Sequence, residues 1–197
     1  MPFPSRHPCH VTLKVRRGVP SLRSVRLVRE MERTFSGACD RGWFRVTHYS
    51  IQRDHVHLVV EAKSAEALGR GMKSIGARFA RAVNRVFGRS GRVLADTYHS
   101  RVLRTPREVR NVLAYVLLNG RRHAARRRRA GPVSTARIDP ASSGRWFDGW
   151  RGRTRGRPRA DREGVPPVAR SHTWLLRVGW RRCGLIDPCE VPGTKGG

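Results

Sequence analysis

The sequence has few acidic residues and no long apolar run, and these two shortages exclude several classes of protein. Only 14 Asp and Glu stand against 42 Lys and Arg in 197 residues, so the net charge at pH 7 is +28. No run approaches the roughly 20 apolar residues that span a bilayer. Residues 1–10 contain no apolar stretch typical of a signal peptide. We therefore expect a cytoplasmic protein that does not insert into membranes.

The cysteines are few and scattered, which argues against a zinc finger or a disulfide framework. None of the four forms a CxxC pair: Cys9, Cys39, Cys183 and Cys189. What the chain has in excess is positive charge, most of it arginine. Such a charge repels itself unless an anionic partner neutralises it, and the commonest such partner is nucleic acid. The alternative is a basic surface that only keeps the chain soluble.

Periodic apolar patterns occur in roughly residues 8–125 and predict the order β-α-β-β-α-β-α. We expect strands at 10–16, 43–51, 55–62 and 92–103, and helices from Ser21 to Gly42, over 64–87 and from Thr105 onward. Thr105, Pro106 and Glu108 together form a complete helix start. The simplest packing is an α+β fold of ferredoxin-like type, with an antiparallel sheet, two helices on one face and an additional catalytic helix elsewhere.

A change in composition after Gly120 predicts two regions, 1–125 and 126–197. The second is rich in Arg, Gly and Pro and is expected to be a basic, largely irregular tail. It contains one short apolar cluster at 174–186. That cluster either docks on the first region or binds another molecule.

The triplet His55-Val56-His57 is the strongest local signal for chemistry. Side chains alternate along a strand, so both imidazoles point to one face while Val56 points to the core. Two neighbouring imidazoles can share a divalent cation. The alternative is a pair of surface histidines with no ligand.

A second signal lies on the last helix, where Tyr115 and Asn119 are four residues apart. Both lie to one side of the apolar stripe of that helix, whereas a tyrosine placed only for packing would lie within it. A tyrosine that packs at the edge of the core with its hydroxyl in solvent is the alternative.

The two signals together resemble the HUH-type single-tyrosine transposases, and within them the REP-associated branch. The matching segments are SIQRDHVHLVVEA, DTYHSRVL and TPREVRNVLAYVLLN, within roughly residues 8–125. The resemblance implies that His55, His57 and Asn119 hold Mg²⁺ or Mn²⁺ and that Tyr115 is the nucleophile. It also implies cleavage of single-stranded, hairpin or palindromic DNA through a 5′-phosphotyrosine intermediate, by a monomer or a homodimer.

Two positions depart from the pattern of that family. The family often has Asn before the first histidine and Asn-Pro at the third ligand, whereas this chain has Asp54 and Asn119-Gly120. Neither change removes a catalytic group. Asp54 can orient an imidazole from behind, and Gly120 suits a helix end.

Further residues are candidates for contacts with DNA, since basic side chains neutralise phosphates and aromatic rings stack on bases. They are His10, Lys14, Arg16, Arg78, Arg81, Arg85, Tyr98, Arg101, Arg121, Arg122, Arg126 and Arg127. For the helical arginines, a solvated cationic face is the alternative.

Two rival functions remain open at this stage. One is a non-catalytic, domesticated DNA- or RNA-binding protein on the same scaffold, although no RNP signature of an RNA-recognition motif is present. The other is a three-carboxylate nuclease, which the few and ungrouped acidic residues disfavour.

Overall fold

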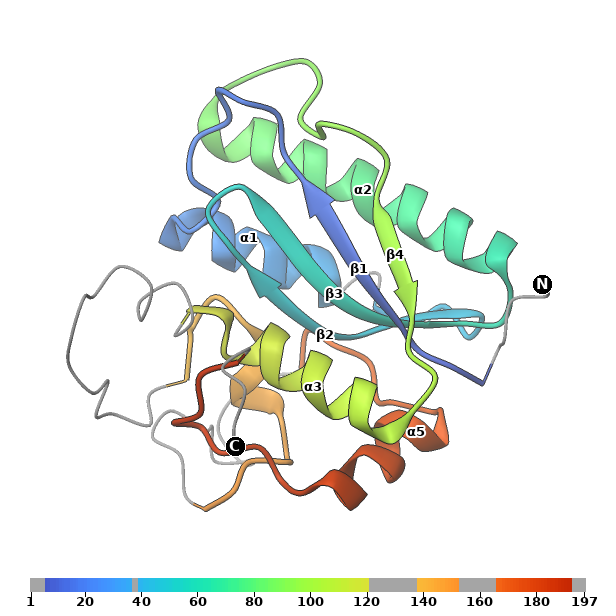
Figure 1. The fold of residues 1–197 in the computed structure, drawn as a ribbon. Coiled ribbons are helices and arrows are strands. Elements are labelled where there is room, and N and C mark those ends of the chain that lie inside the picture. Colours follow the sequence, from blue (N-terminus) through green and yellow to red (C-terminus); the bar gives the residue numbers. More distant parts are fainter. Residues whose placement is uncertain (1–5, 37–38, 121–137, 153–165, 193–197) are drawn as a thin grey trace.

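The computed structural model describes residues 6–36, 39–120, 138–152 and 166–192 and shows the expected order of elements (Figure 1). The first part consists of β1 (Cys9–Lys14), α1 (Val25–Ser36), β2 (Phe44–Ile51), β3 (His55–Ala62), α2 (Ala65–Phe87), β4 (His99–Val102) and α3 (Pro106–Leu117). The second part adds the 3₁₀ turns Ser143–Trp146 and Gly179–Cys183 and the short helix α5 (Trp174–Arg177).

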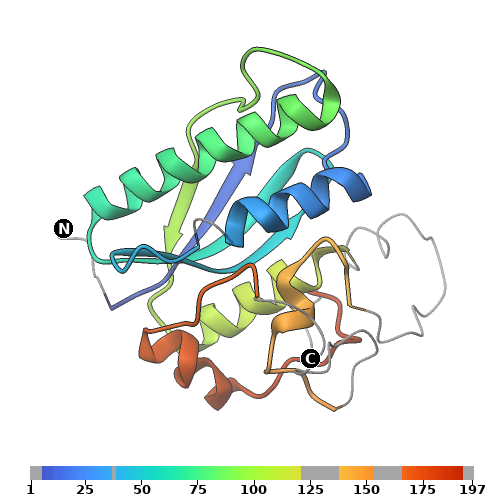
Figure 2. The ribbon, with the colours of Figure 1, turned by 180° about the vertical axis from the view of Figure 1, so that it is seen from behind.

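The four strands form one antiparallel sheet in the order β2-β3-β1-β4. Helices α1 and α2 cover one face of this sheet, and α3 lies on the other (Figures 1 and 2). The expectation of a ferredoxin-like α+β sheet with an additional helix is therefore confirmed. Since α3 lies opposite α1 and α2, it faces the side chains that the core does not use.

Strict alternation along β1 and β3 decides which side chains face the helices. Val11 and Leu13 of β1 and Val56 and Leu58 of β3 are buried in the main core. Three apolar residues at helical spacing on α1 pack against them: Leu27, Met31 and Phe35. The intervening residues of β1 and β3 point to the opposite face, toward α3.

The first helix is shorter than the sequence indicates. It begins at Val25 rather than near Ser21, because the hydroxyl of Ser24 accepts a hydrogen bond from the Leu27 amide and caps the helix. It ends at Ser36, before the turn in which Gly42 has a φ of 69°. Val25, at helical spacing in the sequence, is 66% exposed.

The fourth strand is also shorter than expected, since residues 92–98 are not a continuous strand. Thr12 pairs with His99 and Val15 with Leu94, so the chain between Leu94 and His99 has two residues more than the facing segment of β1. The carboxylate of Asp96 accepts a hydrogen bond from the Thr97 amide within this excursion. The regular strand is therefore limited to His99–Val102, and Leu94 makes only an isolated bridge to Val15.

A second apolar cluster joins α3 to the C-terminal residues. Its members include Val59, Leu113, Val116, Leu117, Phe147, Leu176 and Trp180, all buried. The apolar segment near residue 175 thus docks on α3. No helix in the described ranges is long and apolar enough to cross a membrane.

Candidate active site

The two histidines of β3 lie next to each other on the face of the sheet that α3 covers. Their Nε2 atoms are 3.0 Å apart. Two ligands at right angles on an octahedral Mg²⁺, each ~2.1 Å from the ion, would also lie about 3.0 Å apart. The spacing of His55 and His57 therefore suits a shared cation.

A neighbouring carboxylate sets which nitrogen of the His55 ring carries the proton. The Asp54 carboxylate lies 2.8 Å from His55 Nδ1 and accepts a hydrogen bond from that N–H. This contact holds the pKa of Asp54 below its ordinary value. His55 thereby turns an unprotonated Nε2 toward His57, which is the arrangement that metal-binding histidines use.

The ring of His57 is held in the same way by β1. Its Nδ1 lies 3.1 Å from His10 Nε2 and 3.2 Å from the Thr12 hydroxyl. Burial and the charge of Arg101 lower the pKa of His10 to about 4, so His10 is neutral at pH 7 and can accept. Both neighbours can accept a hydrogen bond from Nδ1–H, and in that tautomer His57 Nε2 could coordinate a cation shared with His55 Nε2.

Tyr115 reaches this pair from α3. The helix starts at the capping box of Thr105 and Glu108, as expected, and this start sets where Tyr115 falls on the helix. The Tyr115 hydroxyl lies 3.3 Å from His57 Nε2, and its ring meets the His10 ring edge-on with centroids 5.9 Å apart. The nucleophile candidate and both ligand candidates therefore meet at one place.

Asn119 follows four residues later, just past the end of α3. It is 1% exposed, and neither polar atom of its side chain has a hydrogen-bond partner in the described part of the chain. A buried amide without a partner is costly, so its presence calls for a ligand. The side-chain oxygen of Asn119 belongs to the class of oxygen ligands that bind Mg²⁺. The described ranges contain no group of three or more His, Cys, Asp and Glu suited to a metal.

The structure brings some of the DNA-contact candidates near this site. Arg101 of β4 pairs in register with His10, and Lys14 of β1 pairs with His55. Both side chains are exposed, as is Arg16 shortly after β1. Tyr98 is half-buried against the main core, on the side of the helices.

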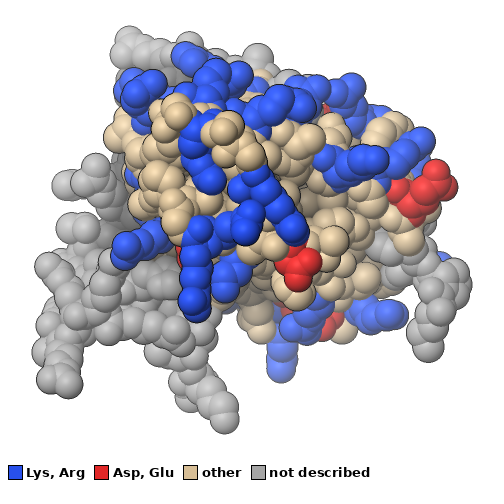
Figure 3. Space-filling view, turned by 90° about the horizontal axis from the view of Figure 1, so that it is seen from above, with Lys and Arg blue, Asp and Glu red and all other residues tan. Residues whose placement is uncertain are grey.

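The remaining candidates lie elsewhere. Arg78, Arg81 and Arg85 belong to α2, behind the sheet as seen from the histidines. Figure 3, which views the molecule from above, shows Lys and Arg spread over its surface with few Asp or Glu among them. Arg85 forms an ion pair with Glu30. Four residues lie outside the described ranges: Arg121, Arg122, Arg126 and Arg127.

Sequence reasoning missed two features of the site. Thr12 shares the polar face of β1 with His10, so strict alternation would have found it. The ion pair of Arg23 with Asp139, with nitrogen and oxygen 2.8 Å apart, joins residues far apart in the sequence and left no signal. Arg23 also donates to the carbonyl of Ile51, at the end of β2. This pair fixes the segment that begins at residue 138 beside the sheet.

Known proteins resemble this chain in sequence and in fold. The family described as transposase IS200 like matches residues 6–116, more than half of the chain. No protein with a curated description matches it. A similar solved structure is a REP-associated tyrosine transposase bound to a REP hairpin, with 14% identity, a TM-score of 0.47 and coverage of 59% of this chain and 68% of that one.

Two further structures are similar at the same level. A protein from Deinococcus radiodurans R1, described as a transposase, has 13% identity, a TM-score of 0.42 and coverage of 49% and 78%. A bacterial tRNA(His) guanylyltransferase-like protein in complex with ATP has 11% identity, a TM-score of 0.43 and coverage of 63% and 62%. The sequence match extends over the whole sheet and as far as Tyr115. The chain belongs to the IS200-like transposase family.

Proposed function

We propose that this transposase is a metal-dependent, single-tyrosine enzyme of the REP-associated type that cleaves and rejoins single-stranded DNA at hairpin sites. One observation carries the proposal. The Tyr115 hydroxyl is 3.3 Å from His57 Nε2, which in turn is 3.0 Å from His55 Nε2. The sequence motifs named above support the assignment to the REP-associated branch.

His55, His57 and Asn119 would hold the cation. Two imidazole nitrogens and one amide oxygen form a mixed set that accepts Mg²⁺ and Mn²⁺ alike. A bound divalent cation would polarise the scissile phosphate and offset the charge that develops on it. Asp54 would orient the His55 ring, and His10 and Thr12 would orient the His57 ring.

Tyr115 would attack the phosphate directly. Its hydroxyl oxygen loses its proton and forms a bond to phosphorus, and the bond from phosphorus to the 3′-oxygen breaks. The 3′-oxygen takes up one proton and leaves as a hydroxyl, so no net proton is gained or lost. The products are a 5′-phosphotyrosine and a free 3′-hydroxyl end. Attack by a second 3′-hydroxyl reverses the step and joins strands without an external energy source, because the phosphotyrosine conserves the bond energy.

The experiment incubates the purified protein with labelled hairpin DNA from around its own gene, with and without Mn²⁺ or Mg²⁺. We expect a DNA–protein adduct that survives a denaturing gel, requires metal and is absent in Tyr115→Phe. Tyr98→Phe is the matched control, because Tyr98 is the other tyrosine considered for this role and packs on the opposite face.

Each outcome decides between the functions considered. Tight binding to several hairpins without an adduct would show that the protein binds DNA but does not cleave it. An adduct that persists in Tyr115→Phe and disappears in Tyr98→Phe would overturn the assignment of the nucleophile. An adduct that forms after exhaustive chelation would overturn the role of the metal.

A further inference from the structure

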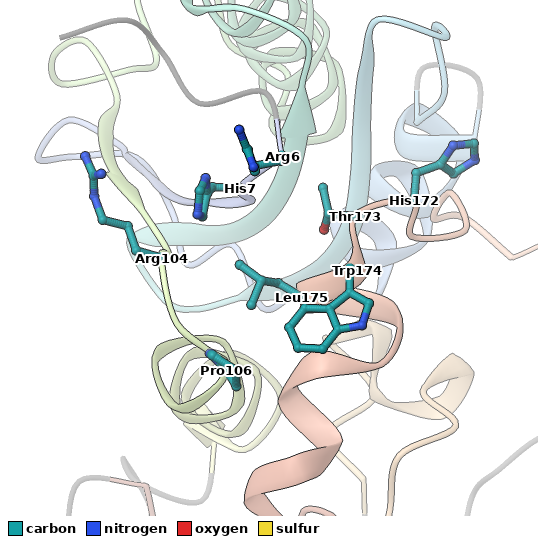
Figure 4. Close-up of a pocket in the computed structure, with 8 residues that line it drawn as sticks. All are labelled: Arg6, His7, Arg104, Pro106, His172, Thr173, Trp174 and Leu175. Atoms are coloured by element: carbon teal, nitrogen blue, oxygen red, sulfur yellow. The ribbon is translucent and has the colours of Figure 1, made fainter.

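A cavity lies at the end of the sheet away from the β2–β3 turn, where β1 begins and β4 ends. Its volume is about 580 Å³, and three segments that are distant in sequence line it (Figure 4). Arg6 and His7 precede β1, Arg104 lies between β4 and α3, and Thr173 and Trp174 lie at the start of α5. We call this cavity the Trp174 pocket.

Specific contacts hold the three segments together. The Leu103 amide donates to the Pro8 carbonyl at 2.8 Å, which joins the first two. The Glu61 carboxylate, buried on β3, accepts hydrogen bonds from the His172 amide at 2.9 Å and the Thr173 amide at 2.7 Å. The walls of the pocket are therefore built into the fold and do not depend on a loose surface loop.

The lining is cationic and offers polar atoms that have no partner. Arg6 and Arg104 are exposed at the pocket, and no carboxylate is among its lining residues. His7 Nδ1 and Thr173 Oγ1 are buried atoms without a hydrogen-bond partner in the described part of the chain. Such atoms indicate a site that a hydrogen-bonding ligand completes, and the two arginines select an anion.

Trp174 gives the pocket an aromatic surface. Half of this residue is exposed, although large aromatic side chains normally bury their apolar area. The ring is nevertheless held in place. It lies so close to Gly179 that a Cβ there would come within 2.5 Å of a ring carbon, and the Arg182 guanidinium lies over one face of the ring, 5.3 Å from its centroid, so a base would stack on the other face. A fixed, exposed ring beside arginines is the combination that stacks an unpaired base and binds its phosphate.

Two independent estimates place the pocket at the same distance from the active site. Pro106 of the pocket and Tyr115 are nine residues apart on α3, about 14 Å at 1.5 Å per residue. Glu61, which anchors the pocket, and His57 are four residues apart on β3, about 13 Å. Exposed Arg101 of β4 lies between the two sites, since it pairs with His10 and is followed by Arg104. The spacing suits a single strand that continues a few nucleotides beyond the scissile phosphate.

We propose that the Trp174 pocket binds one unpaired nucleotide of the DNA strand that is cleaved at Tyr115. The base stacks on Trp174, and the adjoining phosphates contact Arg6 and Arg104. This inference rests on the proposed function, since it takes single-stranded DNA as the substrate. It assigns to the C-terminal residues a part in choosing where the strand is cut.

The test measures the affinity of the full chain, in a Tyr115→Phe background, for a labelled hairpin with unpaired extensions on both sides. Each unpaired nucleotide is replaced in turn by an abasic site. We expect one position, a few nucleotides from the cleavage point, to weaken binding about ten-fold, and Trp174→Ala to weaken binding by the same factor. Combining the two changes should cause no further loss. Val178→Ala is the matched control, since Val178 is equally exposed and lies outside the pocket.

A salt titration tests the phosphate contacts. Arg104→Gln should lower the slope of log affinity against log salt concentration by about 0.7, the value for one phosphate of a single strand. Arg107→Gln removes the same charge from an exposed position of α3 outside the pocket and should keep the slope of the parent. Equal slopes for both variants would overturn the role of Arg104.

Further arms separate this inference from the proposed function. If the Tyr115 adduct forms in the otherwise unchanged protein while Trp174→Ala and Val178→Ala bind DNA equally, the inferred role of the Trp174 pocket is wrong. The proposed enzymatic function is then retained. If no adduct forms, but the abasic site and Trp174→Ala still cause no further loss of affinity when combined, the pocket is a nucleotide-binding site. The proposed enzymatic function is then wrong. Binding of free dAMP, lost in Trp174→Ala, without an abasic effect in the strand would identify the ligand as a free nucleotide and overturn the inference for DNA.

Discussion

The carboxylate of Asp54 determines which nitrogen of His55 is available to a cation, because it accepts a hydrogen bond from Nδ1–H at 2.8 Å. We predict that Asp54→Leu raises the Mn²⁺ concentration needed for half-maximal adduct formation by about 10- to 100-fold. Asp54→Asn should retain most of the activity, since an amide oxygen also accepts this hydrogen bond. The measurement is a Mn²⁺ titration of adduct formation on denaturing gels.

Asp96→Leu serves as the control for loss of an exposed carboxylate. Asp96 is exposed and bonds to the neighbouring Thr97 amide, away from the histidines. An unchanged Mn²⁺ requirement in Asp54→Leu would show that β3 alone orients His55.

Most of the candidate site could be predicted from residue types and spacing. Alternation along a strand is local, so it places His55 and His57 on one face, and the off-stripe position of Tyr115 on its helix turns it toward that face. The contacts of His57 with His10 and Thr12 depend on the register between β1 and β3. Register follows from the whole sheet, and no local pattern in the sequence contains it.

At the scale of elements, close packing of α2 on β2 depends on a glycine. A Cβ on Gly71 would come within 2.3 Å of the Phe44 ring, whereas a Cβ on Gly69, two residues earlier, would meet nothing within 4 Å. We predict that Gly71→Ala lowers the free energy of unfolding by about 1–3 kcal/mol, because the helix must move away from the strand. The measurement is equilibrium unfolding in urea.

Gly69→Ala is the matched control on the same helix. It should raise the free energy of unfolding by about 0.5–1 kcal/mol, since alanine favours a helix and the added methyl group has room. Equal destabilisation by both substitutions would show that the backbone of α2, and not contact with Phe44, requires glycine.

The elements that the sequence predicts well are those with local signals. The capping box of Thr105 and Glu108 and the helix end at Gly88, with a φ of 58°, lie where the sequence indicates. The fourth strand was predicted too long because its apolar residues continue through an excursion around Asp96. The excursion is defined by two extra residues compared with the facing segment of β1, so the sequence of the strand alone does not show it.

At the scale of the whole molecule, α3 is the element that joins the sheet to the C-terminal residues. Its apolar side packs with Phe147 and Trp180 in one cluster, and Arg110 of the same helix forms an ion pair with Glu190 at 2.8 Å. The sequence predicts a boundary between residues 125 and 126, and this boundary stays a prediction. Because the cluster includes Val59 of β3, we expect that disrupting the cluster also destabilises the sheet.

Trp180 lies at the centre of this shared cluster and provides its test. It is 1% exposed, its indole nitrogen donates to the Leu176 carbonyl at 3.0 Å, and its ring centroid is 5.4 Å from that of Phe147. We predict that Trp180→Ala lowers the free energy of unfolding of the whole chain by about 3–5 kcal/mol. Hydrogen exchange should then accelerate in β3 as well as in the C-terminal residues, while Val178→Ala, at an exposed site, leaves both unchanged. Faster exchange confined to the C-terminal residues would instead establish two regions that unfold independently.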